Sequence, residues 1–227
     1  SRHDAGVAYV AVLRYQLGDD KPYVYRAADY GRRWKLLTSG RNGIPADHPV
    51  RVVREDPEVP GLLYAGTERG LYVSFDDGGQ WQRFQQNLPV TPITDIRIHR
   101  DDIALSTMGR GFWILDKGAN TLRQLVQDPD ATSLALFSPA DTVRFRKVYG
   151  APDADAVPQF PTPGVLVDYR LPEGGADALT LEVLDADGQV INAYRSAAEG
   201  DEEMDTIVRD NMAMSTVDYI EGETLTT

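Results

Sequence analysis

The chain has 227 residues, of which 42% are hydrophobic and 26% charged, the composition of an ordinary globular protein. Its formal net charge of −12 would repel a phosphate backbone on average, so we do not expect nucleic acid as a partner. The absence of cysteine excludes disulfides, thiol catalysis and cysteine-ligated metals, and no apolar run approaches the ~18 residues of a membrane-spanning helix.

The first part of the chain reads as one β-rich unit. Residues 4–13 and 23–26 are expected to form two strands, and residues 34–37 a third. The motif AxDxGxxW, which we call an Asp-box, occupies residues 27–34 between the second and third strands. A loop rich in Gly, Pro and Asn over residues 38–49 leads to the next unit.

The second unit repeats this order around a fuller motif. Strands are expected at 50–53, 62–66, 71–74 and 81–84, with SxDxGxxW at 74–81. In such a box the carboxylate can accept backbone N–H bonds across a tight turn, glycine supplies a positive φ, and tryptophan covers the hairpin. We therefore assign the box residues to turn structure rather than to catalysis or metal binding.

The third unit has expected strands at 93–98, 103–106, 112–115 and 121–125, with a degenerate box between the last two that has lost its tryptophan. No segment shows a helical period, which predicts an all-β chain. The structural Asp-box residues of the three units are Asp29, Gly31, Trp34, Ser74, Asp76, Gly78, Trp81, Asp116 and Gly118.

The box aspartates are spaced by 40 to 47 residues. This spacing, with four short strands per repeat, is typical of β-propeller blades, so residues 1–126 are predicted to form about three blades. Propellers close with about four to eight blades. We therefore expect the remaining blades to come from the same parent chain or another chain, and the exposed faces to be an aggregation liability. The Ser-Arg-His start likewise suggests a fragment or processed product.

The period ends after residue 130. Strand-like runs at 135–146, 165–171, 179–184 and 190–194 predict a β-sandwich of fibronectin-III or immunoglobulin type over 135–227. The acidic stretch 197–212 is expected to be a solvated loop, and the sandwich to be truncated. The segment Asp185-Ala186-Asp187-Gly188 resembles the opening of a calcium loop, but no Glu follows at the required offset, so a hairpin turn is favoured.

These motifs resemble the BNR or Asp-box repeat superfamily of β-propellers, which includes sialidases, xyloglucan-hydrolysing propellers, sortilin ectodomains and photosystem-assembly propellers. The run 50–116 is more narrowly similar to large exported bacterial proteins described as sortilin-like or BNR-repeat glycosyl hydrolases. The matching segments are VRVVREDP, GLLYAGTERGLYVSFDDGGQWQ, NLPVTPITDI and GRGFWILD. The resemblance implies a propeller followed by a β-sandwich, and a periplasmic or extracellular location.

In a propeller blade, the turns between the second and third strands lie opposite the Asp-boxes. Residues 67–70 and 108–111 occupy this turn in successive units, so Arg69 and Arg110 are equivalent positions. Two guanidinium groups on one face could bind a carboxylate or sugar hydroxyls. The alternative is that each arginine pairs with a neighbouring acid such as Glu68. The ligand-binding candidates are Arg69, Arg110 and Glu68.

Aromatic residues offer a second pair of interpretations. They could form a platform on which sugar rings stack. The alternative, which alternating aromatics in a blade more often follow, is that they pack between blades. The residues concerned are Tyr64, Tyr72, Phe112 and Trp113.

Glycoside hydrolysis requires two carboxylates roughly 5–10 Å apart. The candidates by residue type are Glu55, Glu58, Glu68, Asp95, Asp101 and Asp102, and most of them fall in predicted turns. We therefore hypothesise a non-catalytic C-terminal portion of an exported Asp-box propeller protein that binds polysaccharide or protein, without cofactor or metal. One alternative is part of a glycoside hydrolase whose carboxylates lie in missing N-terminal blades. The other is a purely structural assembly module.

Overall fold

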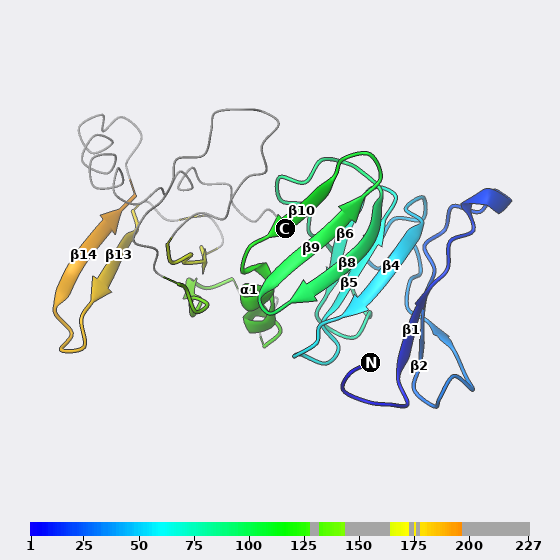
Figure 1. The fold of residues 1–227 in the computed structure, drawn as a ribbon, viewed down its shortest axis with the longest axis horizontal. Coiled ribbons are helices and arrows are strands. Elements are labelled where there is room, and N and C mark those ends of the chain that lie inside the picture. Colours follow the sequence, from blue (N-terminus) through cyan, green and yellow to red (C-terminus); the bar gives the residue numbers. More distant parts are fainter. Residues whose placement is uncertain (128–131, 144–163, 173–174, 176–177, 197–227) are drawn as a thin grey trace. The chain divides into compact units, whose positions relative to one another are not determined.

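The structure is a computed structural model that describes residues 1–127, 132–143, 164–172, 175 and 178–196. The chain divides after residue 130 into two compact units (Figure 1). The regular secondary structure of the described residues is mostly β-strand in antiparallel sheets, with one short α-helix, α1. The expectation of a β-rich chain is therefore confirmed, whereas the expected acidic loop at 197–212 and the rest of the sandwich expected after it lie outside the described residues.

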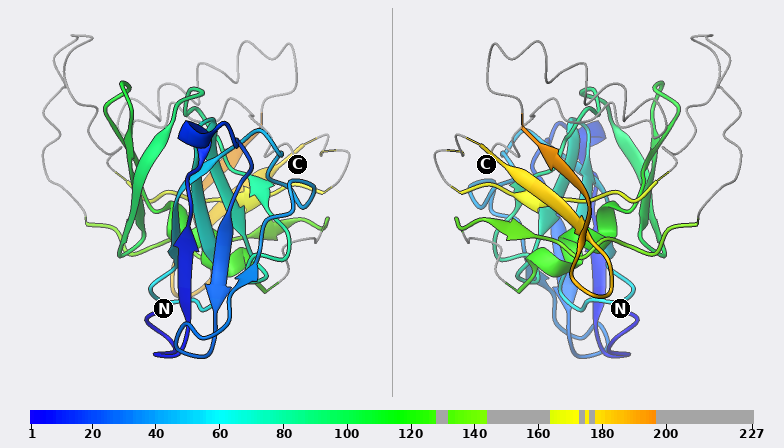
Figure 2. Two further views of the ribbon diagram at one scale, coloured as in Figure 1. Left: turned by 90° about the vertical axis from the view of Figure 1, so that its right-hand side faces the viewer. Right: turned by 90° about the vertical axis from the view of Figure 1, so that its left-hand side faces the viewer.

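The first unit contains three antiparallel sheets, which we number in chain order. Sheet 1 has the strand order β1-β2-β3, sheet 2 the order β4-β5-β6-β7, and sheet 3 the order β10-β9-β8. The left view of Figure 2 looks onto sheet 1, with β1 and β2 facing the viewer. The strands of sheet 1 are β1 (Ala8–Ala11), β2 (Val24–Ala27) and β3 (Lys35–Leu36), with the 3-10 helix η1 (Tyr15–Leu17) between β1 and β2.

Sheet 2 lies between the other two and is buried on both faces. Its strands are β4 (Val50–Glu55), β5 (Leu63–Thr67), β6 (Gly70–Ser74) and β7 (Gln82–Arg83). Every residue of β5 and β6 is buried. Because side chains alternate along a strand, Leu63 and Ala65 pack in a cluster with sheet 1, whereas Tyr64 packs in a cluster with sheet 3.

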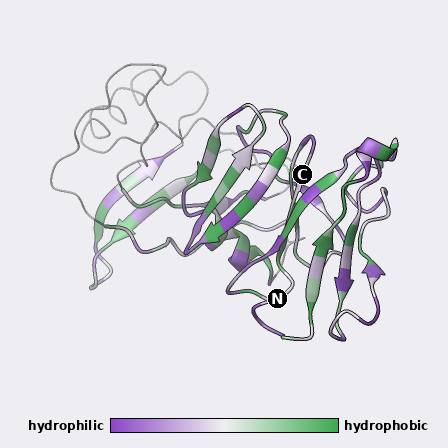
Figure 3. Ribbon diagram, turned by 45° about the vertical axis from the view of Figure 1, so that its right-hand side comes forward, coloured by the Kyte–Doolittle hydropathy of each residue, from purple (hydrophilic) through white to green (hydrophobic). Residues whose placement is uncertain are grey.

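Sheet 3 comprises β8 (Ile93–His99), β9 (Asp102–Thr107) and β10 (Phe112–Leu115). Its buried residues Ile96, Ile103 and Leu105 form the core shared with sheet 2. Along β10, Phe112 and Ile114 are exposed while Trp113 and Leu115 are partly buried, so β10 presents two large apolar side chains to solvent. Bands of apolar and polar residues follow one another along the strands in Figure 3.

The expected strand at 121–125 is wrong. These residues belong to α1 (Gly118–Leu125), whose Ala119 and Leu122 are buried against the core shared by sheets 2 and 3. The two residues are three apart, as one face of a helix requires. The third unit therefore has three strands and a helix, whereas sheet 2 has four strands.

Sheets 2 and 3 repeat each other in detail. The register of β4 shifts between Val50 and Val52 where it pairs with β5, and that of β8 shifts between Ile93 and Asp95 where it pairs with β9. The backbone N–H of Glu68 donates to Pro49 O at 3.0 Å, and a matching bond from Met108 to Pro92 measures 2.9 Å. These matched irregularities identify one structural unit used twice.

Antiparallel pairing places the connections at two ends of this unit. One end, the hairpin end, carries the β1–β2, β5–β6 and β9–β10 connections and the loops that lead into β4 and β8. The opposite end, the box end, carries the Asp-box connections β2–β3 and β6–β7 together with α1. The hairpin end lies uppermost in Figure 1.

The described residues of the second unit form two small antiparallel sheets. One pairs β11 (Ala135–Leu136) with β12 (Tyr169–Arg170), and the other pairs β13 (Thr180–Leu184) with β14 (Val190–Arg195). The latter hairpin faces the viewer in the right view of Figure 2. The β11 and β12 strands are much shorter than the expected runs 135–146 and 165–171. The Asp185 carboxylate accepts backbone N–H bonds from Asp187 and Gln189 at 2.9 and 2.8 Å, and so closes the turn.

Candidate functional site

Two turns at the hairpin end have the same construction. In the β5–β6 turn the Thr67 hydroxyl donates to Gly70 O at 2.9 Å and accepts the backbone N–H of Arg69 at 3.0 Å. In the β9–β10 turn the Thr107 hydroxyl donates to Gly111 O at 2.7 Å and accepts the N–H of Arg110 at 3.2 Å. A threonine at the end of each strand thus holds an arginine at the turn tip.

The acids near Arg69 divide between two arginines. Glu68 lies 2.6 Å from Arg51, and both side chains are largely buried. Arg69 lies 3.7 Å from Asp47, and both of these side chains are more than half exposed. A salt bridge this loose between exposed groups contributes little to stability. The Arg69 guanidinium therefore faces solvent, whereas Glu68 is engaged in anchoring β4.

Arg110 is exposed at the tip of its turn, and its backbone carbonyl accepts the indole N–H of Trp113 at 3.0 Å. Large apolar side chains are also exposed in and beside the hairpin-end loops. They are Leu17, Val90, Met108 and Phe112. Arg110 thus lies in a turn flanked by two of these exposed apolar side chains, Met108 and Phe112.

A partly buried histidine, His48, supports the same end. His48 Nδ1 lies 2.8 Å from the Tyr72 hydroxyl, and the two rings meet edge to face. Burial lowers the pKa of His48 and raises the pKa of Tyr72. The two neutral side chains therefore form a hydrogen bond that fixes the loop leading into β4. The Tyr72 phenol stays protonated and is not an activated nucleophile.

The aromatic candidates do not share one surface. Tyr64 and Tyr72 are 0% and 2% exposed, which leaves no ring face for a sugar to stack on. Both pack between sheets. Phe112 is 85% exposed, whereas Trp113 is partly buried against the core.

At the box end, the first two Asp-boxes use their carboxylates in the same way. Asp29 Oδ1 accepts the backbone N–H of Arg33 at 2.9 Å, and Asp76 Oδ1 accepts that of Gln80 at 2.9 Å. Asp76 also accepts the Ser74 hydroxyl at 2.8 Å. The glycines two residues after these aspartates have positive φ: Gly31 at 79° and Gly78 at 83°.

The two boxes differ in what their tryptophans cover. Trp81 is 3% exposed and belongs to the core between sheets 1 and 2, whereas Trp34 is 44% exposed. In the third unit, Gly118 begins α1 rather than completing a turn of this kind. Burial, reinforced by the nearby Asp102 carboxylate, raises the pKa of Asp116.

The carboxylates that are candidates by residue type lie near cations or backbone donors. Glu58 and Asp101 both lie within 3.2 Å of Arg123, and Asp95 lies 2.5 Å from Arg54. Asp102 accepts the backbone N–H of Lys117 at 2.9 Å. These arrangements hold turns and α1 in place.

Glu55 takes part in a polar cluster between sheets 1 and 2. The Tyr9 hydroxyl donates to Asp77 at 2.6 Å and approaches Glu55 at 3.3 Å. Arg26 lies 2.8 Å from the second Asp77 oxygen. Burial and the Asp77 bond raise the pKa of Tyr9, so this phenol stays protonated and joins the sheets.

Sequence reasoning missed the ion pair that anchors α1. Arg123 Nε donates to the fully buried Asp56 carboxylate at 2.9 Å, across 67 residues of sequence. Asp56 precedes a proline, and this local sequence is typical of a turn. No local pattern indicates that this turn is covered by a helix.

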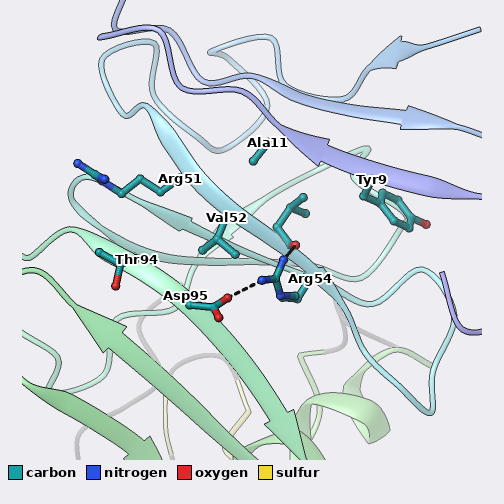
Figure 4. A pocket seen from close by; sticks show the side chains of 8 residues that line it. Tyr9, Ala11, Arg51, Val52, Arg54, Thr94 and Asp95 are labelled. Atoms are coloured by element: carbon teal, nitrogen blue, oxygen red, sulfur yellow. Dashed lines mark hydrogen bonds and ion pairs between the residues drawn. The ribbon is translucent and has the colours of Figure 1, made fainter. Parts of the chain in front are cut away.

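A cavity of about 420 Å³ runs beside β4. Figure 4 shows Arg54 and Asp95 joined across it, with Tyr9 and Ala11 of β1 on one side and Thr94 of β8 on the other. No group of three or more His, Asp or Glu residues in the described parts of the chain could hold a metal ion. Nor is any helix in those parts long and apolar enough to cross a membrane.

A comparison with protein-family models and with curated proteins found no match to this chain.

Proposed function

We propose that residues 1–127 are three successive blades of an Asp-box β-propeller from an exported protein, and that its hairpin end binds another protein. The propeller assignment is supported by the matched register shifts of β4 and β8, and by the shared bonding of Asp29 and Asp76. Two strand pairs in residues 132–196 support a following β-sandwich. The exported location rests on the family resemblance.

The observation that carries the binding function is the composition of the hairpin end. Two equivalent turns present Arg69 and Arg110 to solvent, beside exposed Met108, Phe112 and Val90. Arginine, methionine and aromatic residues are enriched in protein interfaces. A guanidinium group binds a carboxylate through two parallel hydrogen bonds, so the expected partner surface combines an acidic side chain with apolar groups.

A protein ligand is favoured over a polysaccharide because the rings of Tyr64 and Tyr72 are buried. Sugar recognition by stacking would need exposed aromatic faces in a row. A purely structural module is less favoured than a binding module, because it would give the exposed arginines no role in binding.

The test starts from peptides selected on the full chain by phage display. Binding of each peptide is then measured to the native chain and to the double variant Arg69→Ala/Arg110→Ala. The matched control is Arg97→Ala, which removes an exposed arginine from β8, away from the hairpin-end turns. We expect the double variant to lose about tenfold or more in affinity and the control to lose none. Equal affinity for all three proteins would refute the proposal, and selective binding of a polysaccharide panel would replace it.

A further inference from the structure

The strand β1 has one edge that no described strand occupies, because sheet 1 has the order β1-β2-β3. The backbone N–H of Val12 donates to Tyr23 O on the β2 side at 3.0 Å, and Val10 pairs with Tyr25 in the same register. Hydrogen-bonding direction alternates along an antiparallel strand. The backbone groups of Tyr9 and Ala11 therefore point away from β2, toward the open edge.

The internal repeat identifies β1 as the counterpart of β5. Before β1, Gly6 O accepts the backbone N–H of Tyr30 at 3.0 Å; before β5, Gly61 O accepts that of Asp77 at 3.0 Å. Tyr30 and Asp77 occupy the same Asp-box position and have φ values of 59° and 58°. Counting from these glycines, Tyr9 corresponds to Tyr64.

In sheet 2 this edge is filled. Tyr64 and Gly66 of β5 are paired with Arg54 and Val52 of β4, and the N–H of Asp56 donates to Leu62 O at 2.8 Å in the same ladder. By the same count Ala11 corresponds to Gly66. The open edge of β1 is thus the position that β4 occupies in sheet 2 and β8 in sheet 3.

Space is present beside this edge. The cavity of about 420 Å³ is lined by Tyr9 and Ala11 of β1, by Arg51–Arg54 of β4 and by Thr94 and Asp95 of β8. In Figure 4, β1 borders the cavity and runs past β4. An extended chain paired with Tyr9 and Ala11 would lie along this cavity, next to β4, as β4 lies next to β8.

We propose that the open edge of β1 accepts one extended peptide segment with the sequence pattern of β4. That pattern is two aliphatic residues three positions apart, Val50 and Val53 in β4 and Ile93 and Ile96 in β8. The strands β4 and β8 already pair with β5 and β9, so the occupant is a further segment. Main-chain bonds to Tyr9 and Ala11 give affinity, and the aliphatic positions give register. The site is separate from the arginines of the hairpin end.

The test uses the full chain and a synthetic peptide with the sequence of residues 49–56, PVRVVRED. Amide hydrogen exchange is followed by NMR with and without saturating peptide. The N–H groups of Tyr9 and Ala11 should exchange at least about tenfold more slowly with peptide, while those of Val10 and Val12, which already face β2, should not change. A peptide N-methylated on its β1-facing edge should give no protection.

The variant Ala11→Pro removes the edge donor without touching a bond to β2, and proline is tolerated on strand edges. We expect it to weaken peptide binding at least about tenfold. The Arg69→Ala/Arg110→Ala variant should bind the peptide normally, which separates this proposal from that for the hairpin end. The absence of protection at Tyr9 and Ala11, or equal protection by the N-methylated peptide, would overturn the proposal. Protection already present without peptide would overturn it too, because the edge would then be occupied by the chain itself or a second copy.

Discussion

Gly31 and Gly78 occupy the same position in two Asp-boxes, with φ of 79° and 83°. They differ in what surrounds them. A Cβ added at Gly78 would lie 2.6 Å from Leu37 Cδ1 in the core between sheets 1 and 2. At Gly31 the nearest atom would be Trp34 Cζ2 at 3.6 Å, an ordinary contact. Alanine substitutions at the two glycines therefore separate the free-energy cost of backbone strain from the cost of overpacking the core.

We expect Gly31→Ala to cost about 1 kcal/mol, the strain of an L-residue in the left-handed region. Gly78→Ala should cost about 1–3 kcal/mol more, because the methyl group also overpacks the core. Urea unfolding of both variants measures the difference. Equal losses would mean that Leu37 moves aside freely and that sheets 1 and 2 are packed loosely at this point.

His48 should make the free energy of unfolding depend on pH, and the direction of this dependence follows from its pKa. Its pKa is lowered in the folded protein, chiefly by burial, against a smaller opposing effect of Asp47. The unfolded chain therefore takes up a proton near pH 6.5 while the folded chain resists it. Stability should fall as the pH drops from about 7.5 through 6.5 to 5.5.

The His48→Gln variant should lose this part of the pH dependence, because glutamine does not titrate. Urea midpoints at the three pH values measure it for the native chain and the variant. His99→Gln, at an exposed position at the end of β8, serves as the control and should keep the native slope. A His48→Gln protein with the native slope would show that other groups control the acid response.

At the scale of elements, α1 is held to the sheets by a buried charge. Asp56 is 0% exposed, and its carboxylate accepts N–H bonds from Glu58, Val59 and Arg123 and the hydroxyl of Tyr64. Burial, reinforced by this carboxylate, raises the pKa of Tyr64. Within the part of the chain that the structure describes, Arg123 is the one cation in direct contact with the Asp56 carboxylate, so removing it would leave a buried charge uncompensated.

Arg123→Ala should therefore destabilise the unit by about 3–5 kcal/mol. Glu58→Ala should cost less than about 1 kcal/mol, because Glu58 meets the same guanidinium but is 61% exposed. Chemical unfolding followed by tryptophan fluorescence compares the two variants. A loss at Arg123 no greater than that at Glu58 would mean that the α1 anchor contributes little.

The strands of sheet 2 could be predicted from sequence because their apolar runs are long and bounded by turn residues. For α1 the repeat spacing was misleading, since it placed a fourth strand where Ala119 and Leu122 instead line one helical face. The pairing of Arg123 with Asp56 depends on tertiary contacts across 67 residues, which no local pattern encodes. The spacing of the turns was enough to place the hairpin-end arginines. It could not predict that Glu68 pairs with Arg51, because that contact is also tertiary.

At the scale of the whole unit, β10 of sheet 3 presents two large apolar side chains to solvent. Phe112 is 85% and Ile114 63% exposed, on the side of β10 opposite Trp113 and Leu115. Exposed apolar sheet faces favour association with other molecules. The full chain should therefore bind a hydrophobic dye and show concentration-dependent light scattering.

The double variant Phe112→Thr/Ile114→Thr should reduce both signals and change the unfolding free energy by less than about 1 kcal/mol, because these side chains bury little area. Ile103→Thr is the matched control on β9 of the same sheet: at 1% exposed, it should cost about 2–4 kcal/mol and leave the exposed face intact. If the double variant instead unfolds the chain while native protein binds no dye, the face is covered in solution, and sheet 3 has a neighbour that adds to its stability. Reduced scattering at native stability would mean that the face is open and available to a further sheet.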